Sequence, residues 1–469
     1  MKGRWFVCLV VGVFLAALAA PVRAGQGDKI VRTKSLDGLP VVNNLCKVVG
    51  CAVIRSLDTL PGSTQPSSLF LVRGLVDNTL TVVLGLLGLS AVEPDLPVAV
   101  AADGAYTPSQ ASVALVDGEL WNRTPMSYYG TSAWESYLKQ PANDIVRLRE
   151  THCTLRATGG GIVAVIDTGV DPDHPTLKPF LTGGYDFVRG KDGGDERPDT
   201  DVNQASVALV DQYGVYWVNP SSFAALDQAS VALVDDSNHA DFGHGTMVAG
   251  VVHLVAPTAR IMPLKAFGPD GQGYTSDVLR AVYYAVLKGA KVLNMSFSRP
   301  TSSPELKRAI DNATSKGLIA VASAGNDGKA TLMYPAAYDN VIGVASTSND
   351  DVRSIFSNYG SQLVWVAAPG EGIITTYPWA GFAGAWGTSF STPYVSGAAA
   401  LLVGMQGSAS NSQVTSAVAH AKWISSDLGK GRLDLYQTVQ TGRSLWPYAA
   451  NSPVPASCGD STADWSPVQ

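Results

Sequence analysis

The sequence is short of charged residues, and this shortage excludes two classes of protein. Only 15% of its 469 residues are charged, against ~25% in an average soluble domain, while 46% are hydrophobic. Such a chain is not disordered as a whole, because disordered chains combine few hydrophobic residues with a high net charge. The 33 Lys and Arg are outnumbered by 39 Asp and Glu, which argues against a nucleic-acid binder, since those proteins carry a basic surface. We therefore expect a compact globular protein.

No apolar run reaches the ~20 residues that a membrane-spanning helix needs. The run from Trp5 to Ala20 follows Lys2 and Arg4 and precedes a small-residue segment that ends at Ala24. This order is typical of an export signal, here residues 1–24, and a membrane anchor is the weaker alternative. We expect a secreted protein, extracellular or in the cell envelope, whose mature form has no membrane span.

Cysteine is also scarce, with five in the chain. Removal of the signal would discard Cys8 and leave an even number, which in an exported protein predicts disulfides. We expect the pairs Cys46–Cys51, close in sequence, and Cys153–Cys458, which would join the start of the main domain to its tail. Four free buried thiols are the alternative. No Cys or His pair nearby has the ligand spacing of a zinc site.

The texture of the sequence divides the chain into two parts. Residues 25–105 predict a small α+β region that leads into a Gly/Pro/Ala-rich linker over 97–108. In residues 106–450, short apolar strands alternate with amphipathic helices, which predicts an α/β fold with a mainly parallel sheet covered on both faces. Residues 451–469 form a tail. The expected strands of the sheet are Ile162–Ile166, Val292–Met295, Leu318–Ala322, Val341–Ala345 and Leu363–Ala367.

Two helices of the main domain have clear end signals. One follows Ser276 as its candidate N-cap and ends at Gly289. The other starts with a capping box over 302–305, with a proline in its first turn, and ends at Gly317. These signals follow the usual preference for Ser at the start of a helix and Gly at its end.

The peptide Gln-Ala-Ser-Val-Ala-Leu-Val-Asp occurs three times, at 110–117, 204–211 and 228–235. The two later copies lie in an insertion over about 190–238. The unequal spacing is not that of a solenoid. Either the repeats form an added edge ribbon or binding loop, or they are a duplicated insertion that the surface tolerates.

Four polar residues follow apolar strands or begin apolar helices. Asp167 ends a strand, His244 lies between two glycines at a helix start, Ser389 begins another helix, and Asn326 follows a strand. A serine hydroxyl is a poor nucleophile until a base removes its proton, and the base needs an acid to orient it. A carboxamide can bind the oxyanion that forms. Taken singly these residues are more often turn residues or caps, but together they predict a hydrolase.

The surrounding motifs resemble those of the subtilisin-like serine peptidases, the subtilases. Asp167 stands in Ala-Val-Ile-Asp-Thr-Gly, His244 in Gly-His-Gly-Thr, Ser389 in Gly-Thr-Ser-Phe-Ser-Thr-Pro, and Asn326 in Ser-Ala-Gly-Asn-Asp. The resemblance covers roughly 130–445. It implies a three-layer α/β/α fold and a secreted endopeptidase made as an autoprocessed zymogen. It also implies Ser389 as nucleophile, His244 as general base and then acid, Asp167 as orienting group, and Asn326 as part of the oxyanion hole.

The resemblance further implies where substrate binds. The segments 296–298 and 267–273 should flank an extended peptide, and 323–325 should line the primary specificity pocket. The N-terminal region is similar to an inhibitory, chaperone-type propeptide whose last strand, near 92–95, leads into the cleft. Peptides and proteins are the expected substrates, the expected state is a monomer, and the chemistry needs no cofactor or metal. The substrate-binding residues so implied are Ser296, Phe297, Ser298, Ser323, Ala324 and Gly325.

Some residues depart from the family pattern. Met247 and Tyr394 stand where His is common, Phe390 where Met is common, and Ser298 where Gly is frequent. Family members often hold calcium near the acidic run over 192–201, so a structural Ca²⁺ is left open beside a solvated acidic loop. That run comprises Asp192, Asp195, Glu196, Asp199 and Asp201.

Other functions are weighed against this one. An aspartic peptidase needs a second Asp-Thr/Ser-Gly motif, which the chain lacks. The nucleophile elbow of the α/β-hydrolases needs a glycine two residues after the serine, where this chain has Ser391. A catalytically inactive binding protein on the same scaffold is the main alternative, opposed by the intact set of four residues. A metal site from His239, His244 and His253 is disfavoured, because these spacings do not share a helix face.

Overall fold

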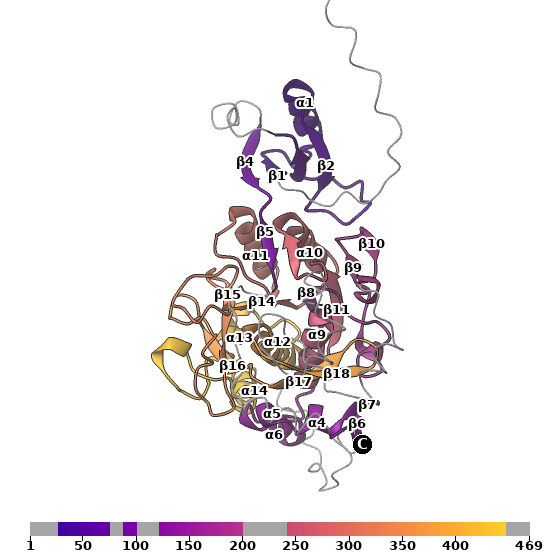
Figure 1. Ribbon diagram of the computed structural model, residues 1–469. Helices are drawn as coiled ribbons and strands as arrows, with labels where there is room; N and C mark the ends of the chain where they lie inside the picture. Colours follow the sequence, from indigo (N-terminus) through magenta and orange to yellow (C-terminus); the bar gives the residue numbers. More distant parts are fainter. Residues whose placement is uncertain (1–26, 76–87, 101–121, 200–241, 447–469) are drawn as a thin grey trace, which may run out of the picture.

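The computed structural model describes residues 27–75, 88–100, 122–199 and 242–446. The predicted signal, the tail, Cys458 and all three repeat copies lie outside the described residues. The chain forms a small lobe and a large lobe, joined by an extended segment (Figure 1). The described residues of the small lobe form a four-stranded sheet in the order β2-β3-β1-β4 and one helix. Its elements are β1 (Lys29–Thr33), α1 (Leu39–Val49), β2 (Ala52–Ser56), β3 (Leu69–Arg73) and β4 (Leu89–Pro94).

The large lobe is built on an eight-stranded sheet in the order β10-β9-β11-β8-β13-β14-β15-β16. Its strand pairs are parallel except β10 with β9. The predicted α/β class and the three-layer architecture are therefore confirmed. The strands are β8 (Ile162–Asp167), β9 (Tyr185–Asp186), β10 (Lys191–Asp192), β11 (Arg260–Lys265), β13 (Val292–Met295), β14 (Ile319–Ser323), β15 (Val341–Thr347) and β16 (Val366–Pro369).

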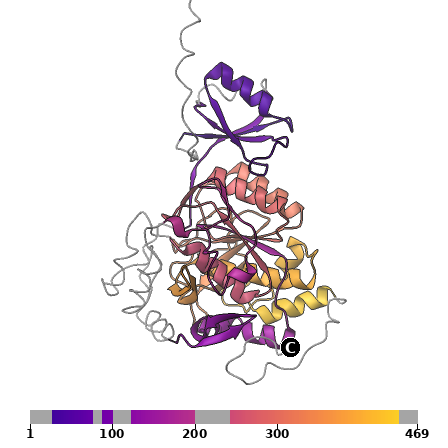
Figure 2. The same ribbon diagram turned by 90° about the vertical axis from the view of Figure 1, so that its right-hand side faces the viewer.

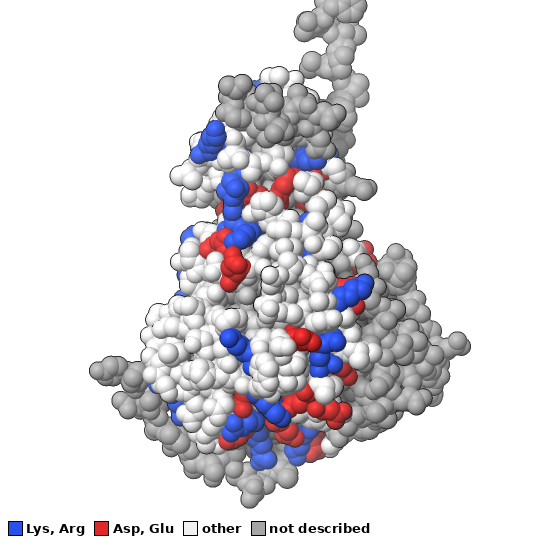
Figure 3. Space-filling view, turned by 90° about the vertical axis from the view of Figure 1, so that its left-hand side faces the viewer, with Lys and Arg blue, Asp and Glu red and all other residues white. Residues whose placement is uncertain are grey.

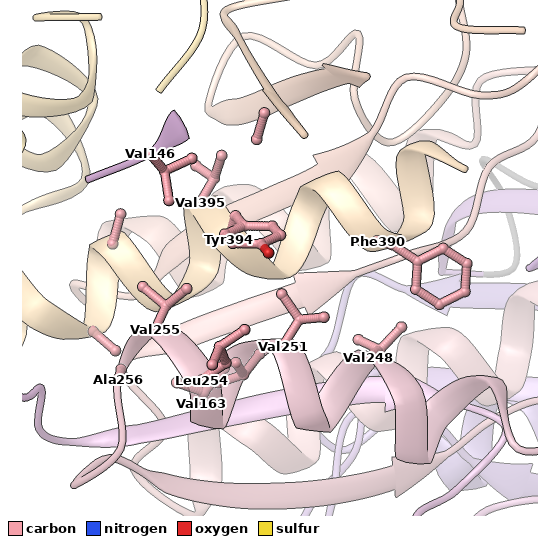
Figure 4. Close-up of a cluster of buried hydrophobic side chains, with 14 of the residues drawn as sticks. Val146, Val163, Val248, Val251, Leu254, Val255, Ala256, Phe390, Tyr394 and Val395 are labelled. Carbon is pink, nitrogen blue, oxygen red and sulfur yellow. The ribbon is translucent and has the colours of Figure 1, made fainter. Parts of the chain in front are cut away.

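Both faces of the sheet are buried, and strand periodicity divides its side chains between two cores. In β8, Val163 and Val165 belong to one hydrophobic cluster, and Ala164 and Ile166 belong to the other. Helices α9 (His244–Val255) and α12 (Thr388–Met405) pack on the first face. Helices α10 (Thr275–Leu287) and α11 (Pro304–Ser315) pack on the second. Figure 4 shows Val248, Val251 and Val255 of α9 on the side of that helix that faces Phe390 and Tyr394 of α12.

The expected last strand, Leu363–Ala367, is placed wrongly by two to three residues. The N–H groups of Leu363 and Val364 bond the carbonyl oxygen of Gly360 at 3.0 and 2.9 Å, so these two residues form a turn. The strand β16 begins only at Val366. Both turn residues are nevertheless buried, which explains why their apolar character suggested a strand.

The predicted starts of the two helices need correction. Ser276 is not the N-cap of α10: Tyr274 holds that position, and Ser276 lies in the first turn. For α11 the cap is Ser303, whose hydroxyl accepts from the Leu306 N–H, so the predicted capping box over 302–305 does not form. The predicted terminal glycines 289 and 317 are confirmed just after the two helices, with φ of 77° and 86°.

The remaining elements complete the large lobe. Among the described residues, one hairpin and three short helices precede β8, further short elements lie between β8 and α12, and two α-helices and a 3₁₀ helix follow α12. They are β6 (Pro125–Tyr128), β7 (Thr131–Trp134), α4 (Glu135–Leu138), α5 (Pro141–Ile145), α6 (Leu148–Leu155), η2 (Lys178–Phe180), η3 (Arg197–Asp199), β12 (Gln272–Tyr274), β17 (Ile373–Tyr377), β18 (Gly381–Ala385), α13 (Asn411–Val418), η5 (Ser426–Leu428) and α14 (Leu435–Leu445).

One predicted disulfide is confirmed, between Cys46 and Cys51, with an S–S distance of 2.03 Å. It closes the end of α1 onto the start of β2. Cys153 is also disulfide-bonded, but Cys458 lies outside the described residues, so the Cys153–Cys458 pair stays a prediction.

The surface bears out the low charge of the sequence. Figure 3 shows one face on which basic and acidic side chains are interspersed among wide areas that carry neither. In the described part of the chain, no helix combines the length and the apolar character needed to cross a bilayer.

Candidate active site

The topology brings the predicted residues to one edge of the sheet. Asp167 is the last residue of β8, and Asn326 follows β14 by three positions. Strand β13 lies between β8 and β14, and all three run parallel, so their carboxyl ends meet at the same edge. His244 is the first residue of α9, and Ser389 is the second of α12. Ligands of open parallel sheets bind at this edge.

The Asp167 carboxylate holds the His244 ring. Oδ1 of Asp167 lies 2.7 Å from Nδ1 of His244 and also accepts from the Thr168 N–H at 2.7 Å. Asp167 is fully buried, and His244 is 6% exposed. A buried carboxylate bonded to Nδ1 fixes the orientation of the ring and leaves Nε2 on the far side for proton transfer.

Ser389 is the second residue of α12, one position before a residue that contacts His244. The ring of the next residue, Phe390, contacts the His244 ring with centroids 5.3 Å apart. The Ser389 hydroxyl has two carbonyl oxygens in reach, those of Ser296 at 3.3 Å and Val100 at 3.5 Å. The Ser296 hydroxyl donates to the Ser389 carbonyl at 2.8 Å, which secures the helix start against the end of β13.

The side-chain amide of Asn326 is oriented by its own oxygen. Oδ1 accepts from the N–H and from the hydroxyl of Thr388, both at 2.9 Å. The Nδ2 group is therefore turned away from Thr388 and lies near Gly387, 3.5 Å from where a Cβ of that glycine would be. The donor thus lies within two residues of Ser389.

The small lobe sends an extended segment along the large lobe as far as Ser389. Strand β5 (Pro97–Ala99) pairs antiparallel with β12, and Ala99 also bridges to Ser298, whose N–H bonds the Ala99 carbonyl at 3.1 Å. The Val100 N–H bonds the Gly271 carbonyl at 3.0 Å. The prediction of a linker from residue 97 is therefore wrong for 97–99, because backbone partners on both sides order this part as a strand.

The other expected substrate-binding residues lie close by. Phe297 is fully buried against Phe267, and its carbonyl accepts from the Ser323 hydroxyl at 3.3 Å. The Gly325 N–H bonds the Thr388 hydroxyl at 3.2 Å, which holds the segment after β14 against the start of α12. Ala324 is fully buried in the same segment. Their role in specificity stays a prediction.

Behind the site lies a group of buried charges that the sequence did not reveal. Glu196 and Lys265 are both fully buried. Burial raises the pKa of Glu196 to about 7 against the effect of its hydrogen bonds, and it lowers the pKa of Lys265 to about 8. Lys265 pairs with Asp199 at 2.5 Å. Glu196 lies 47 and 50 residues before its partners Gly243 and Thr246, so this separation in sequence hid the contacts.

Three carboxylates of the acidic run are engaged by groups of the protein itself, and Asp201 lies outside the described residues. Asp195 pairs with Arg197 at 2.9 Å, Asp199 pairs with Lys265 and Arg189, and Glu196 accepts from backbone and hydroxyl groups. These carboxylates therefore do not fit a calcium site. Among the residues that the structure describes, no group of three or more His, Cys, Asp or Glu could hold a metal ion.

The comparisons with known proteins agree with this geometry. The sequence profile of the subtilase family (Peptidase_S8) matches residues 158–442. Thermitase of Thermoactinomyces vulgaris is 33% identical over 295 residues, covering 60% of this chain and 89% of that protein. Subtilisin BL of Lederbergia lenta is 34% identical over 286 residues, covering 59% and 87%.

Solved structures support the fold. Fervidolysin from Fervidobacterium pennivorans superimposes with a TM-score of 0.62 at 22% identity, covering 92% of this chain and 62% of that one. A lanthipeptide protease gives a TM-score of 0.52 at 23% identity, covering 65% and 95%. The profile match spans more than half of the chain and includes Asp167, His244, Asn326 and Ser389. The chain therefore belongs to the subtilase family and is a subtilisin-like serine endopeptidase.

Proposed function

We propose that Ser389, His244 and Asp167 form the catalytic triad and that Asn326 supplies a donor of the oxyanion hole. The observation that carries this proposal is the 2.7 Å contact between Asp167 Oδ1 and His244 Nδ1, at the sheet edge where α12 presents Ser389. An inactive binding protein would need none of these groups, and the intact set speaks against that alternative.

The chemistry is acyl transfer in two steps. Ser389 Oγ attacks the carbonyl carbon of the scissile bond, while Nε2 of His244 takes the hydroxyl proton. Asp167 stabilises the imidazolium. The oxyanion accepts from Asn326 Nδ2 and from backbone N–H groups, and the N-terminus of α12 favours its charge. His244 then protonates the leaving amine, and water attacks the acyl-enzyme by the same route.

We also propose that the chain is a secreted zymogen in which the small lobe is the inhibitory propeptide. The support is the course of β5, which lies as a middle strand between β12 and Ser298, as an extended substrate would. Val100 is 2% exposed, and its carbonyl oxygen is the one near Ser389 Oγ. The Val100–Ala101 bond is therefore the expected site of self-cleavage.

The propeptide is also anchored on two helices of the large lobe (Figure 2). The Asp95 carboxylate accepts from the N–H and hydroxyl of Ser276 at 2.8 and 2.7 Å, in the first turn of α10. The Glu93 carboxylate accepts from the Ser303 hydroxyl at 2.5 Å and from the Glu305 N–H at 3.2 Å, at the start of α11. Carboxylates at helix N-termini accept hydrogen bonds from free N–H groups and interact favourably with the helix dipole.

A labelling experiment tests the proposed function. The mature enzyme treated with a sulfonyl fluoride should carry one adduct, on Ser389, and its N-terminal residue should be Ala101. Peptide mapping by mass spectrometry reads both. A different labelled residue would remove Ser389 as nucleophile. A mature chain that starts past Gly161 would contradict propeptide release, because it would have lost part of the domain itself.

Binding of the cleaved propeptide should weaken as pH rises. Burial raises the pKa of Asp95 from its ordinary value of 3.8 to about 7, and it also raises the pKa of Glu93. A carboxyl whose pKa is raised in the complex takes up a proton on binding, so the complex is strongest near pH 4 and loses stability as pH rises through about 7. The change is at most about tenfold in Kd per pH unit and group. The charged groups that face the two acids are Asp28, Asp277, Glu305, Arg55 and Arg299.

Size-exclusion chromatography of the cleaved complex between pH 5 and pH 9 measures this release. Asp95→Asn should flatten the pH dependence, whereas Asp37→Asn, at an exposed position of the same lobe, should leave it unchanged. Release that increases toward acid pH would contradict the prediction.

A further inference from the structure

Glu196 is a buried carboxylate whose partners come from both proposed triad segments. Its Oε2 accepts from the Thr168 hydroxyl at 2.8 Å and from the Gly243 N–H at 3.0 Å. Its Oε1 accepts from the Thr246 N–H at 3.1 Å and from the Thr246 hydroxyl. Thr168 is the residue after Asp167, and Gly243 and Thr246 flank His244. One side chain therefore touches the chain on either side of the Asp167–His244 contact.

These bonds supply the cap that α9 lacks locally. The residue before the helix is Gly243, which has no side chain to cap it. The Thr168 hydroxyl, which donates to Glu196, accepts from the Gly245 N–H at 2.9 Å. Three N–H groups around His244 are thus satisfied by Glu196 directly or through Thr168. The positive end of the helix in turn stabilises the carboxylate.

The segment that carries Glu196 is itself held tightly against the Asp167 turn. The Val170 N–H bonds the Gly194 carbonyl at 2.7 Å. A Cβ at Gly169 would lie 2.6 Å from that carbonyl oxygen and 3.0 Å from the Glu196 Cβ, so only glycine fits there. The Thr246 hydroxyl also accepts from the Asp171 N–H at 2.8 Å. These contacts therefore fix the position of the loop over 194–196, which carries Glu196.

From these contacts we infer that Glu196 is a positioning residue for the peptidase reaction: it fixes the start of α9 against the end of β8, and with it the geometry of His244 and Asp167. The inference rests on the proposed triad. It requires no contact of Glu196 with substrate. A misplacement of about 1 Å in a catalytic group can lower the rate on the order of 100-fold. Loss of the Glu196 hydrogen bonds, which we call the Glu196 clamp, should therefore lower kcat and leave substrate binding intact.

The variant Glu196→Gln tests the inference, because it keeps the side-chain volume but presents an NH₂ group to at least one of the N–H donors. In the full-length chain, we expect self-cleavage and the rate of inactivation by a sulfonyl fluoride both to fall on the order of 10- to 100-fold. In the matured enzyme kcat should fall in parallel, with KM within about twofold, since β12 and Ser298 do not touch Glu196.

A matched control separates positioning from a loss of stability. Asp434→Asn removes the negative charge that pairs with Arg147 at 3.2 Å beside the start of α14, at a position with no hydrogen bond to the proposed triad. It should lower the melting temperature and leave kcat unchanged. Should Glu196→Gln fail to fold, Thr168→Val removes one arm of the same clamp at equal volume, and kcat should fall about tenfold.

The inference is overturned if a folded Glu196→Gln or Thr168→Val enzyme keeps kcat and the inactivation rate within twofold of wild type. It is also overturned if KM alone changes. Its failure is distinct from that of the proposed function: an inactive Ser389→Ala enzyme beside a normal Glu196→Gln enzyme would keep the triad and remove only the positioning role.

Discussion

The variant Ser389→Ala should stay a full-length, uncut chain and lose peptidase activity by about 10⁶ in kcat, a magnitude known from subtilisins themselves. The reason is that Ser389 is the proposed nucleophile, so without its hydroxyl the acyl-enzyme cannot form. Gel analysis of freshly expressed chain reads the processing, and hydrolysis of casein reads the activity.

Ser391→Ala is the matched control for this experiment. Ser391 lies two residues along the same helix, is fully buried, and its hydroxyl has no hydrogen-bond partner among the described residues. The control should mature and digest casein like the wild type. If instead Ser389→Ala itself matures and digests casein, the assignment of the nucleophile is wrong.

The variant Asn326→Ala should lower kcat by about 10² to 10³, again the range known for subtilisin, with little change in KM. The donor is needed most when negative charge develops on the carbonyl oxygen, so its loss raises the transition state more than the bound substrate. Steady-state kinetics on a chromogenic peptide measures the effect. Asn340→Ala, at an exposed asparagine remote from α12, should behave like the wild type. An unchanged kcat in Asn326→Ala would remove this residue from the oxyanion hole.

The part of the fold that could be predicted is the part coded by local patterns. The buried strands around Asp167 and Asn326 are continuous apolar runs, and the parallel pairing of the sheet follows from their alternation with helices. Each of the four residues of the candidate site stands in a short sequence motif, so it could be recognised without knowledge of its distant contacts. Residues 363 and 364 were wrongly predicted as part of a strand, because an apolar side chain indicates that a residue is buried but not which backbone conformation it has.

What escaped prediction depends on contacts between distant segments. Ser276 looked like a cap because the sequence could not show that Asp95, from another lobe, fills that role. Glu196 looked like one member of a solvated acidic loop, since two of its partners, Gly243 and Thr246, lie 47 and 50 residues further along the chain. Residues 97–99 looked like a linker because a Pro/Ala-rich segment has no strand signal of its own. In each case the partner, and not the residue, decides the structure.

The course of β5 also bears on how the enzyme would become active after self-cleavage at Val100. Before the cut, β5 and the large lobe that it pairs with belong to one chain. Binding of β5 is therefore set by a high effective concentration that does not depend on how dilute the protein is. After the cut, the small lobe is a separate molecule, and rebinding depends on the concentration of both. Dilution on leaving the cell would then favour the active enzyme, whereas a crowded compartment would keep it blocked.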